Sequence, residues 1–275
     1  VMILEALGLK TPQFAHLPMV LGGNRQKLSK RNGDVSVQDY LDKGYFPQAL
    51  LNFLALLGWW PPENYEPQSG HPEILTMDEM VQTFSLAGLG KSASVFDVEK
   101  LKWMNSFYLQ SLPMEEVFPR AKPFFENSSD SLIQSALKEK SEDWLWKVID
   151  VVRGANLSLL SELPQAAALF FQTDPTPNPD ASELLKETAA SGDLKNILDA
   201  FQAELDALGE TLSEQDVSSL QKNLQKKTGL KGKKLFKPLR AIATGSTSGR
   251  DLAKMIPLLG KDRVIKRLEK AREFL

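Results

Sequence analysis

The chain has 275 residues, 42% of them apolar and 25% charged, with a formal net charge of −2. These values describe an ordinary globular protein with room for two or more domains, and they exclude a largely disordered chain. The chain has no apolar run long enough to span a membrane, no signal-peptide pattern and no cysteine, so we expect no membrane contact, no metal site and a reducing, cytoplasmic location.

The first residues predict a helix over Val1–Leu9 that ends near Gly8. No capping residue or turn stands before Val1, so the helix begins in mid-pattern. We therefore expect the chain to be a piece of something longer. The apolar segment Leu17–Leu21 predicts a short strand that leads directly into two glycines.

The segment from Gly22 to Gly33 holds four basic residues and no acidic residue. Its glycines allow the backbone to turn sharply, so it predicts a positive loop. Lys27 and Lys30, with Ser29 between them, could place two ammonium groups and a hydroxyl on one polyphosphate, which suits phosphoryl or adenylyl transfer. The alternative is a solvated basic loop, since charge runs are usually surface features.

After the loop, residues 35–41 begin a helical region, and Pro47–Leu57 is apolar on nearly all sides and is predicted to be a buried helix. Thr76 and Glu79 have the spacing of a capping box, which predicts a helix start. In residues 95–105 we expect Phe96, Leu101 and Trp103 to pack in the core. The candidates there for contact with a ligand or with the basic loop are Lys100, Lys102 and Asn105.

From residue 109 onward the pattern predicts helices joined by short polar turns. These helices are Met114–Pro123, Asp130–Lys138, Trp144–Arg153 and Pro164–Phe171. The segment Gln172–Asp180 carries three prolines in nine residues and is the clearest linker.

Beyond the linker the charge divides into two halves. Residues 174–216 hold 11 acidic and 2 basic residues, whereas residues 222–275 hold 16 basic and 4 acidic residues. The densest stretch, Lys222 to Arg240, has eight basic residues and no acidic one, and this is the electrostatic pattern expected of a nucleic-acid-binding surface. Gly229 and Gly245 are predicted to end helices, and Pro238 to begin one.

Several blocks of the sequence resemble one family. Phe14–Gly22 followed by Lys27–Arg31, the segment Gly44–Trp59, the segment Gly229–Gly245 and the ending 262–274 together resemble bacterial-type glutamyl-tRNA synthetase, a class I aminoacyl-tRNA synthetase. The resemblance implies a mainly α fold: the remnant of a class I catalytic domain with its signature loop, then stem-contact helices, then two all-helical anticodon-binding subdomains. The expected boundaries are 1–34, 35–108, 109–179 and 180–275.

In this family the basic loop is the second ATP signature. The resemblance therefore implies that Lys27, Leu28, Ser29, Lys30 and Arg31 bind ATP, with Lys27, Ser29 and Lys30 acting in catalysis. It also implies a ligase that takes ATP with Mg²⁺, glutamate and tRNA(Glu), and that acts as a monomer. The first ATP signature and the glutamate pocket have no counterpart in the sequence, so we expect the chain alone to be inactive and to hold no cofactor firmly.

The family also reads anticodon bases. The arginine that relatives use for the third base falls on Asn156, and Arg153 one turn earlier could substitute. The contacts to the first base fall on Arg240 and Leu252, and Ser248-Gly249-Arg250 stands where relatives often have His-Gly-Pro. The alternative reading is a tRNA- or RNA-binding helical module without catalysis. The expected tRNA-binding residues are Arg153, Asn156, Lys231, Lys233, Lys234, Lys237, Arg240, Arg250 and Leu252.

Overall fold

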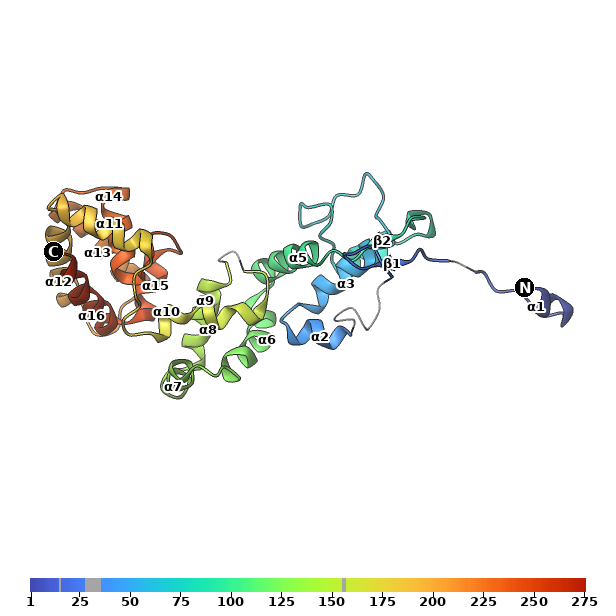
Figure 1. The fold of residues 1–275 in the computed structure, drawn as a ribbon, viewed down its shortest axis with the longest axis horizontal. Coiled ribbons are helices and arrows are strands. Elements are labelled where there is room, and N and C mark those ends of the chain that lie inside the picture. The colour runs from blue at the N-terminus through green and yellow to red at the C-terminus, as the bar shows by residue number, and fades with distance from the viewer. Residues whose placement is uncertain (15, 28–35, 155–156) are drawn as a thin grey trace. The chain divides into compact units, whose positions relative to one another are not determined.

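The computed structural model describes residues 1–14, 16–27, 36–154 and 157–275. It is mainly helical, as the sequence predicts, with one short pair of strands among the described residues (Figure 1). The chain divides into two compact units, Val1–Tyr108 and Leu109–Leu275. Among the described residues, none of the helices is both long and apolar enough to cross a membrane.

The first unit combines short helices with a two-stranded parallel sheet, in which Val20 lies opposite Ser94 and Leu21 opposite Val95. The predicted strand Leu17–Leu21 is therefore shorter than expected. The first helix ends at Ala6, close to the predicted position. The elements are α1 (Met2–Ala6), β1 (Val20–Leu21), α2 (Val37–Asp42), α3 (Pro47–Leu56), α4 (Met77–Thr83), η2 (Leu86–Gly88), β2 (Ser94–Val95) and α5 (Val98–Ser111).

Helix α3 packs against α4 and is buried on one side only. Its buried residues include Phe53, whereas Leu51 and Leu54 are 39% and 42% exposed, so the prediction of burial on nearly all sides is wrong. Leu54 lines an apolar cavity of about 530 Å³ together with residues of β1, α4 and η2. A side chain that lines a cavity is exposed to it, although it is as apolar as a core side chain. The sequence pattern alone cannot distinguish these two positions.

Two expectations for residues 95–105 are corrected. Asn105 is fully buried, and its Oδ1 accepts a hydrogen bond of 2.7 Å from the backbone N–H of Phe46, which precedes α3. Asn105 therefore supplies the acceptor for a backbone N–H at the start of α3, and it exposes no surface to RNA. Phe96 and Leu101 are buried as predicted, but Trp103 is 39% exposed, with its ring 4.7 Å from that of His71.

The predicted capping box at Thr76 is confirmed, and its acidic partner does more than cap. Glu79 is 2% exposed. Its carboxylate accepts hydrogen bonds from the hydroxyls of Tyr65 (3.0 Å) and Thr76 (2.9 Å) and from the backbone N–H groups of Gln68 (2.7 Å) and Thr76 (2.8 Å). Burial raises the pKa of Glu79, but these hydrogen bonds outweigh it and the pKa lies below the ordinary value.

Replacing Glu79 with Gln is expected to lower the free energy of unfolding of the first unit at pH 7 by about 1–3 kcal/mol, because an amide cannot accept the same set of donors. The folded pKa is depressed, so the carboxylate stabilises the unit above its unfolded pKa and loses this effect as the pH falls through the folded pKa. Urea denaturation of both proteins from pH 7 to pH 3 checks this. A difference that stays constant down to pH 3 would contradict the assignment.

The second unit begins with helices that pack around α6. Helix α6 contacts α7, α8, α9 and η3, and the predicted helix Pro164–Phe171 is divided into two short pieces. The elements are α6 (Met114–Glu126), α7 (Ser131–Glu139), α8 (Glu142–Val152), η3 (Leu160–Glu162), α9 (Leu163–Ala166) and α10 (Ala168–Phe171).

The rest of the second unit is a helical bundle that begins at Pro179, near the end of the proline-rich linker (Figure 1). Helix α12 packs on α13, α13 packs on α15, and α16 packs on α12, α14 and α15. Gly229 and Gly245 end helices with φ of 71° and 72°, as predicted. The elements are α11 (Pro179–Ala190), α12 (Asp193–Asp206), α13 (Glu214–Thr228), α14 (Lys233–Thr244), α15 (Leu252–Leu259), α16 (Lys261–Ala271) and η4 (Arg272–Phe274).

Pro238 does not begin a helix, contrary to the prediction. It lies inside α14, which starts at Lys233, and its side chain is buried. The helix starts earlier because Gly232, with φ of 58°, turns the chain before Lys233. The consequence is that a helix, and not a loop, holds Lys233, Lys234 and Lys237.

Candidate nucleic-acid interface

Six lysines on α13, α14 and the turn between them form what we call the basic face. All six are exposed. Within the described part of the chain none of them forms an ion pair, whereas neighbouring Lys227 pairs with Glu204 at 2.6 Å. Unpaired surface lysines keep their charge available to an external anion. The basic face consists of Lys222, Lys226, Lys231, Lys233, Lys234 and Lys237.

Helix α14 aligns part of this charge in one direction. Lys233, Lys237 and Arg240 are separated by four and three residues, so they lie on the same face of the helix. The opposite face is buried in the bundle through Leu235, Leu239, Ile242 and their neighbours. The first turn of α14 contains no acidic residue, and a helix start attracts negative charge. The arrangement suits a row of phosphates.

Arg240 lies at the end of this row, where the basic face meets the bundle. It is partly buried, and its Nη1 donates to the backbone carbonyl of Arg250. Burial lowers the pKa of Arg240, and the nearby carboxylate of Asp251 opposes this. The hydrogen bond to Arg250 fixes the guanidinium, which stays charged because arginine is not deprotonated in proteins. A fixed guanidinium with donors in a planar fork is suited to the edge of a base.

Arg153, the residue predicted to read the third anticodon base in place of Asn156, is bound to partners within the protein. Its Nη1 donates to the backbone carbonyl of Leu112 at 2.6 Å, and its other nitrogens bind Asp150 at 3.0 Å. These contacts hold the guanidinium to the chain that follows α5, so Arg153 has few donors for RNA. Asn156 lies outside the described residues.

Two further predicted contacts differ in accessibility. Arg250 is partly buried beside Gly154, whereas Leu252, the first residue of α15, is only 2% exposed. The contact of Leu252 with a base remains a prediction. Leu252 exposes very little surface to such a contact.

The signature loop begins in a tight turn. The backbone N–H of Arg25 donates to the carbonyl of Gly22 at 2.8 Å, and that of Gly22 donates to the carbonyl of Gln26 at 2.8 Å. This turn brings Lys27 opposite Leu21 of β1, with the Lys27 side chain exposed. The remaining predicted ATP-binding residues, Leu28, Ser29, Lys30 and Arg31, lie outside the described residues.

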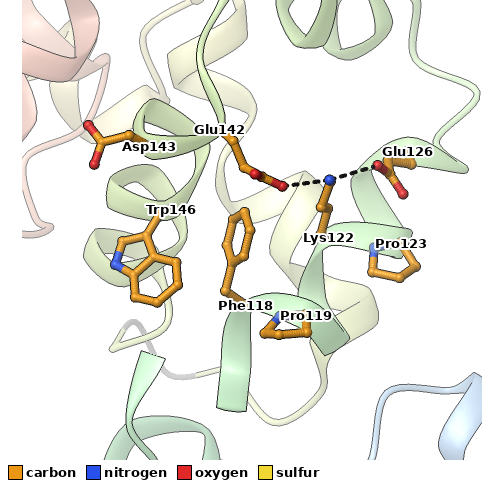
Figure 2. A pocket seen from close by; sticks show the side chains of 8 residues that line it. All are labelled: Phe118, Pro119, Lys122, Pro123, Glu126, Glu142, Asp143 and Trp146. Atoms are coloured by element: carbon orange, nitrogen blue, oxygen red, sulfur yellow. Dashed lines mark hydrogen bonds and ion pairs between the residues drawn. The ribbon is translucent and has the colours of Figure 1, made fainter. Parts of the chain in front are cut away.

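A cavity between α6 and α8 differs from the basic face, because aromatic side chains and carboxylates line it. It has a volume of about 720 Å³, and Figure 2 shows the rings of Phe118 and Trp146 facing it, with centroids 5.0 Å apart. Lys122 is held between Glu142 at 2.6 Å and Glu126 at 3.4 Å, and these carboxylates raise its pKa. Because its one lysine is neutralised, this cavity does not belong to the nucleic-acid interface.

Sequence reasoning overlooked two members of the interface. Lys222 and Lys226 belong to the unpaired set but were not singled out, although their acid-free surroundings gave the same signal as the other lysines. Gly154, which lies against Arg250, had no sequence signal. The described residues contain no cluster of three or more histidine, cysteine, aspartate or glutamate side chains that could hold a metal ion.

Comparison with known proteins gives two domain matches. Residues 116–272 match the sequence profile of the anticodon binding domain, and residues 1–103 match that of the catalytic domain of class I tRNA synthetases (E and Q). The glutamate–tRNA ligases of Natranaerobius thermophilus and Carboxydothermus hydrogenoformans are each 37% identical to the chain. Both alignments cover 98% of this chain, and 52% and 53% of those proteins.

Among solved structures, a glutamate tRNA ligase from Elizabethkingia meningosepticum in complex with its amino acid superposes with a TM-score of 0.74 at 26% identity. The alignment covers 99% of this chain and 53% of that one.

The two profile matches place the chain in the class I tRNA synthetases, with a helical anticodon-binding region. Within that class, the chain belongs to the glutamyl-tRNA synthetase family and is homologous to the C-terminal half of glutamate–tRNA ligase. It spans about half the length of the curated relatives that it matches.

Proposed function

We propose that the chain is the tRNA-binding half of a glutamate–tRNA ligase, an enzyme that activates glutamate with ATP and transfers it to tRNA(Glu). The observation that carries this proposal is the basic face of six exposed, unpaired lysines, which lies within the segment matched by the anticodon binding domain. Such a surface binds the phosphate backbone, and a fixed arginine at its end reads a base. The enzyme acts in the cytoplasm as a monomer.

In this proposal each part of the chain has a role. Residues 1–34 end the catalytic domain, 35–108 contact the tRNA stem, and 109–179 and 180–275 bind the anticodon arm. Lys27 and Lys30 bind the triphosphate of ATP, which arrives with Mg²⁺, and Ser29 and Arg31 support them. The exposure of Lys27 and the absence of acidic residues from 22 to 33 fit this role. ATP supplies the adenylate that activates glutamate, and the residues of this chain position its phosphates.

Replacing Arg240 with Ala is expected to weaken binding of tRNA(Glu) by about 1–3 kcal/mol and to remove the preference at one anticodon base. Replacing Lys233 with Ala should instead weaken binding of all tRNAs alike and reduce the slope of log K against log salt by about one. Fluorescence anisotropy across a salt series, with tRNA(Glu), anticodon variants and an unrelated tRNA, measures both. A uniform loss for the Arg240 variant would make that residue a backbone contact.

The same titrations test the proposed function itself. If the unchanged chain binds all these RNAs equally and releases them together as salt rises, base reading must be withdrawn. A non-catalytic tRNA-binding module would bind in the same way as the ligase. Glutamate activation separates the two. With the family's nucleotide-binding half present, the ligase activates glutamate and the non-catalytic module does not.

A further inference from the structure

The cavity between α6 and α8 has the volume and the apolar surface of a small-ligand site. Its volume of about 720 Å³ lies in the range of about 300–1,000 Å³ that such sites occupy. The rings of Phe118 and Trp146, with centroids 5.0 Å apart, face the cavity, and Trp146 is partly exposed (Figure 2). Pro119 and Pro123 lie four residues apart on α6 and add apolar surface. A planar group can therefore stack in this cavity.

Four charged side chains also line the cavity, and three of them are acidic. The acidic ones are Glu126, Glu142 and Asp143, each more than half exposed, and the basic one is Lys122. Asp143 also pairs with Lys147, one turn further along α8, at 2.7 Å. Negative charge therefore exceeds positive charge at the cavity, and the field there attracts cations.

Lys122 shows how these carboxylates hold a cation. Its ammonium lies 2.6 Å from Oε1 of Glu142 and 3.4 Å from Oε1 of Glu126, so carboxylates of α8 and α6 converge on one charge (Figure 2). The hydrogen bond to Glu142, followed by that to Glu126, raises the pKa of Lys122. A carboxylate accepts through both of its oxygens. A second cation can therefore pair with the same two carboxylates.

The chemistry of the cavity excludes the proposed substrates and favours a guanidinium. Glutamate, ATP and tRNA carry net negative charge, which the carboxylates repel. A guanidinium is planar, so it stacks on an aromatic ring, and its fork of N–H groups pairs with carboxylates. An ammonium is a compact, strongly hydrated charge and stacks less well. Free arginine carries a carboxylate of its own, whereas an arginine within a polypeptide does not, so the polypeptide arginine fits best.

We propose that the cavity between α6 and α8 is a docking site for an arginine side chain of a protein partner. The guanidinium stacks on Trp146 and pairs with Glu126 and Glu142. The basic face lies on α13, α14 and the turn between them, so the partner and the tRNA use different helices of the same unit. The inference goes beyond the proposed function and stands without it.

The test titrates the full chain with acetyl-Gly-Arg-Gly-amide and follows the indole N–H signals of its five tryptophans by NMR. The variant Trp146→Phe identifies the signal of Trp146. This signal should shift with a dissociation constant on the order of 1–10 mM, as expected for one stacked and paired cation. The matching citrulline peptide, in which a neutral urea replaces the guanidinium, should bind at least about 5-fold more weakly. The lysine peptide should bind about 2- to 5-fold more weakly, and free arginine should also bind more weakly than the arginine peptide.

Two variants change the affinity in opposite directions. Lys122→Met removes the resident ammonium and leaves both glutamates to the peptide, so binding should become about 3- to 10-fold tighter. Glu142→Gln removes one carboxylate and should weaken binding by about the same factor. Lys138, an exposed lysine of α7 outside the lining of the cavity, gives the matched control. Lys138→Met should leave the affinity unchanged within about twofold, because solvent and salt screen its charge. Circular dichroism checks that each variant is folded.

Four results would overturn the inference. Equal affinity for the citrulline peptide would reduce the cavity to an apolar surface. Equal affinity for the lysine peptide would show that charge alone acts and would remove the guanidinium. Tighter binding of free arginine would make a small molecule the occupant. If neither Lys122→Met nor Glu142→Gln changes the affinity, the peptide binds elsewhere. None of these results depends on tRNA, so the proposed function can stand where the inference fails.

Discussion

Replacing Arg267 with Met is expected to lower the free energy of unfolding of the Leu109–Leu275 unit by about 3–5 kcal/mol. Arg267 is 3% exposed, and burial, with Arg263 nearby, lowers its pKa to about 10. Instead of a carboxylate, it has backbone carbonyls as partners. Its donors reach Leu169 (2.6 Å), Gln172 (2.7 Å), Thr173 (3.3 Å) and Ala243.

These carbonyls belong to two separate places in the chain. One group lies at the end of α10 and the start of the linker, and the other lies in the last turn of α14. Helix C-terminal carbonyls have no intrahelical donors and favour a positive charge, so Arg267 acts as a shared cap. Met fills a similar volume but leaves buried acceptors unsatisfied, which is the reason for the large effect.

Urea denaturation followed by tryptophan fluorescence measures this change, since Trp144 lies in the same unit and donates to the carbonyl of Leu258 at 2.9 Å. The matched control is Arg272→Ala, which removes one exposed ion pair to Asp199 and should cost at most about 1 kcal/mol. Arg267→Lys should fall between the two, because an ammonium can satisfy only some of the carbonyls. An Arg267→Met variant as stable as the control would show that the carbonyls find water instead.

Features with a local cause were predictable from the sequence. The capping box at Thr76 and the helix ends at Gly229 and Gly245 depend on residues within one turn of each other. The division into an acidic and a basic half required only counting charges. Most of the basic face followed, because the stretch from 222 to 240 contains no acidic residue. Lys227, which lies in this stretch and pairs with Glu204 of α12, shows that the sequence alone does not establish which lysines are unpaired.

Features that depend on distant partners were not predictable. The acceptors of Arg267 lie 24 to 98 residues away in sequence, and Gly154 meets Arg250 across a similar separation. Asn105 looked like an exposed polar residue, because nothing local shows that its oxygen caps α3. Pro238 has the chemistry of a helix start, and only the turn at Gly232 shows that the helix begins earlier. In each case tertiary packing overrides the local pattern.

Replacing Lys30 with Ala is expected to raise the activation free energy of adenylate formation by about 2–4 kcal/mol in the ligase that carries the family's nucleotide-binding half. This corresponds to a rate lower by roughly 30- to 1,000-fold. Lys30 lies outside the described residues, and the prediction rests on its spacing from Lys27, the exposed residue that leads into the loop. Loss of one ammonium from a clamp on developing charge lowers the rate without changing the tRNA surface.

ATP–pyrophosphate exchange in the presence of glutamate and tRNA measures adenylate formation, and anisotropy measures tRNA affinity on the same protein. Arg25→Asn is the matched control, because it removes a positive charge from the same loop and asparagine tolerates the φ of 58° found there. The control should change the exchange rate by less than about threefold. Equal losses of exchange and of tRNA affinity in the Lys30 variant would make the loop an RNA contact. A loss in exchange alone would assign the binding of ATP phosphates to the loop near Lys27. The anticodon bases would then be left to the residues near Arg240.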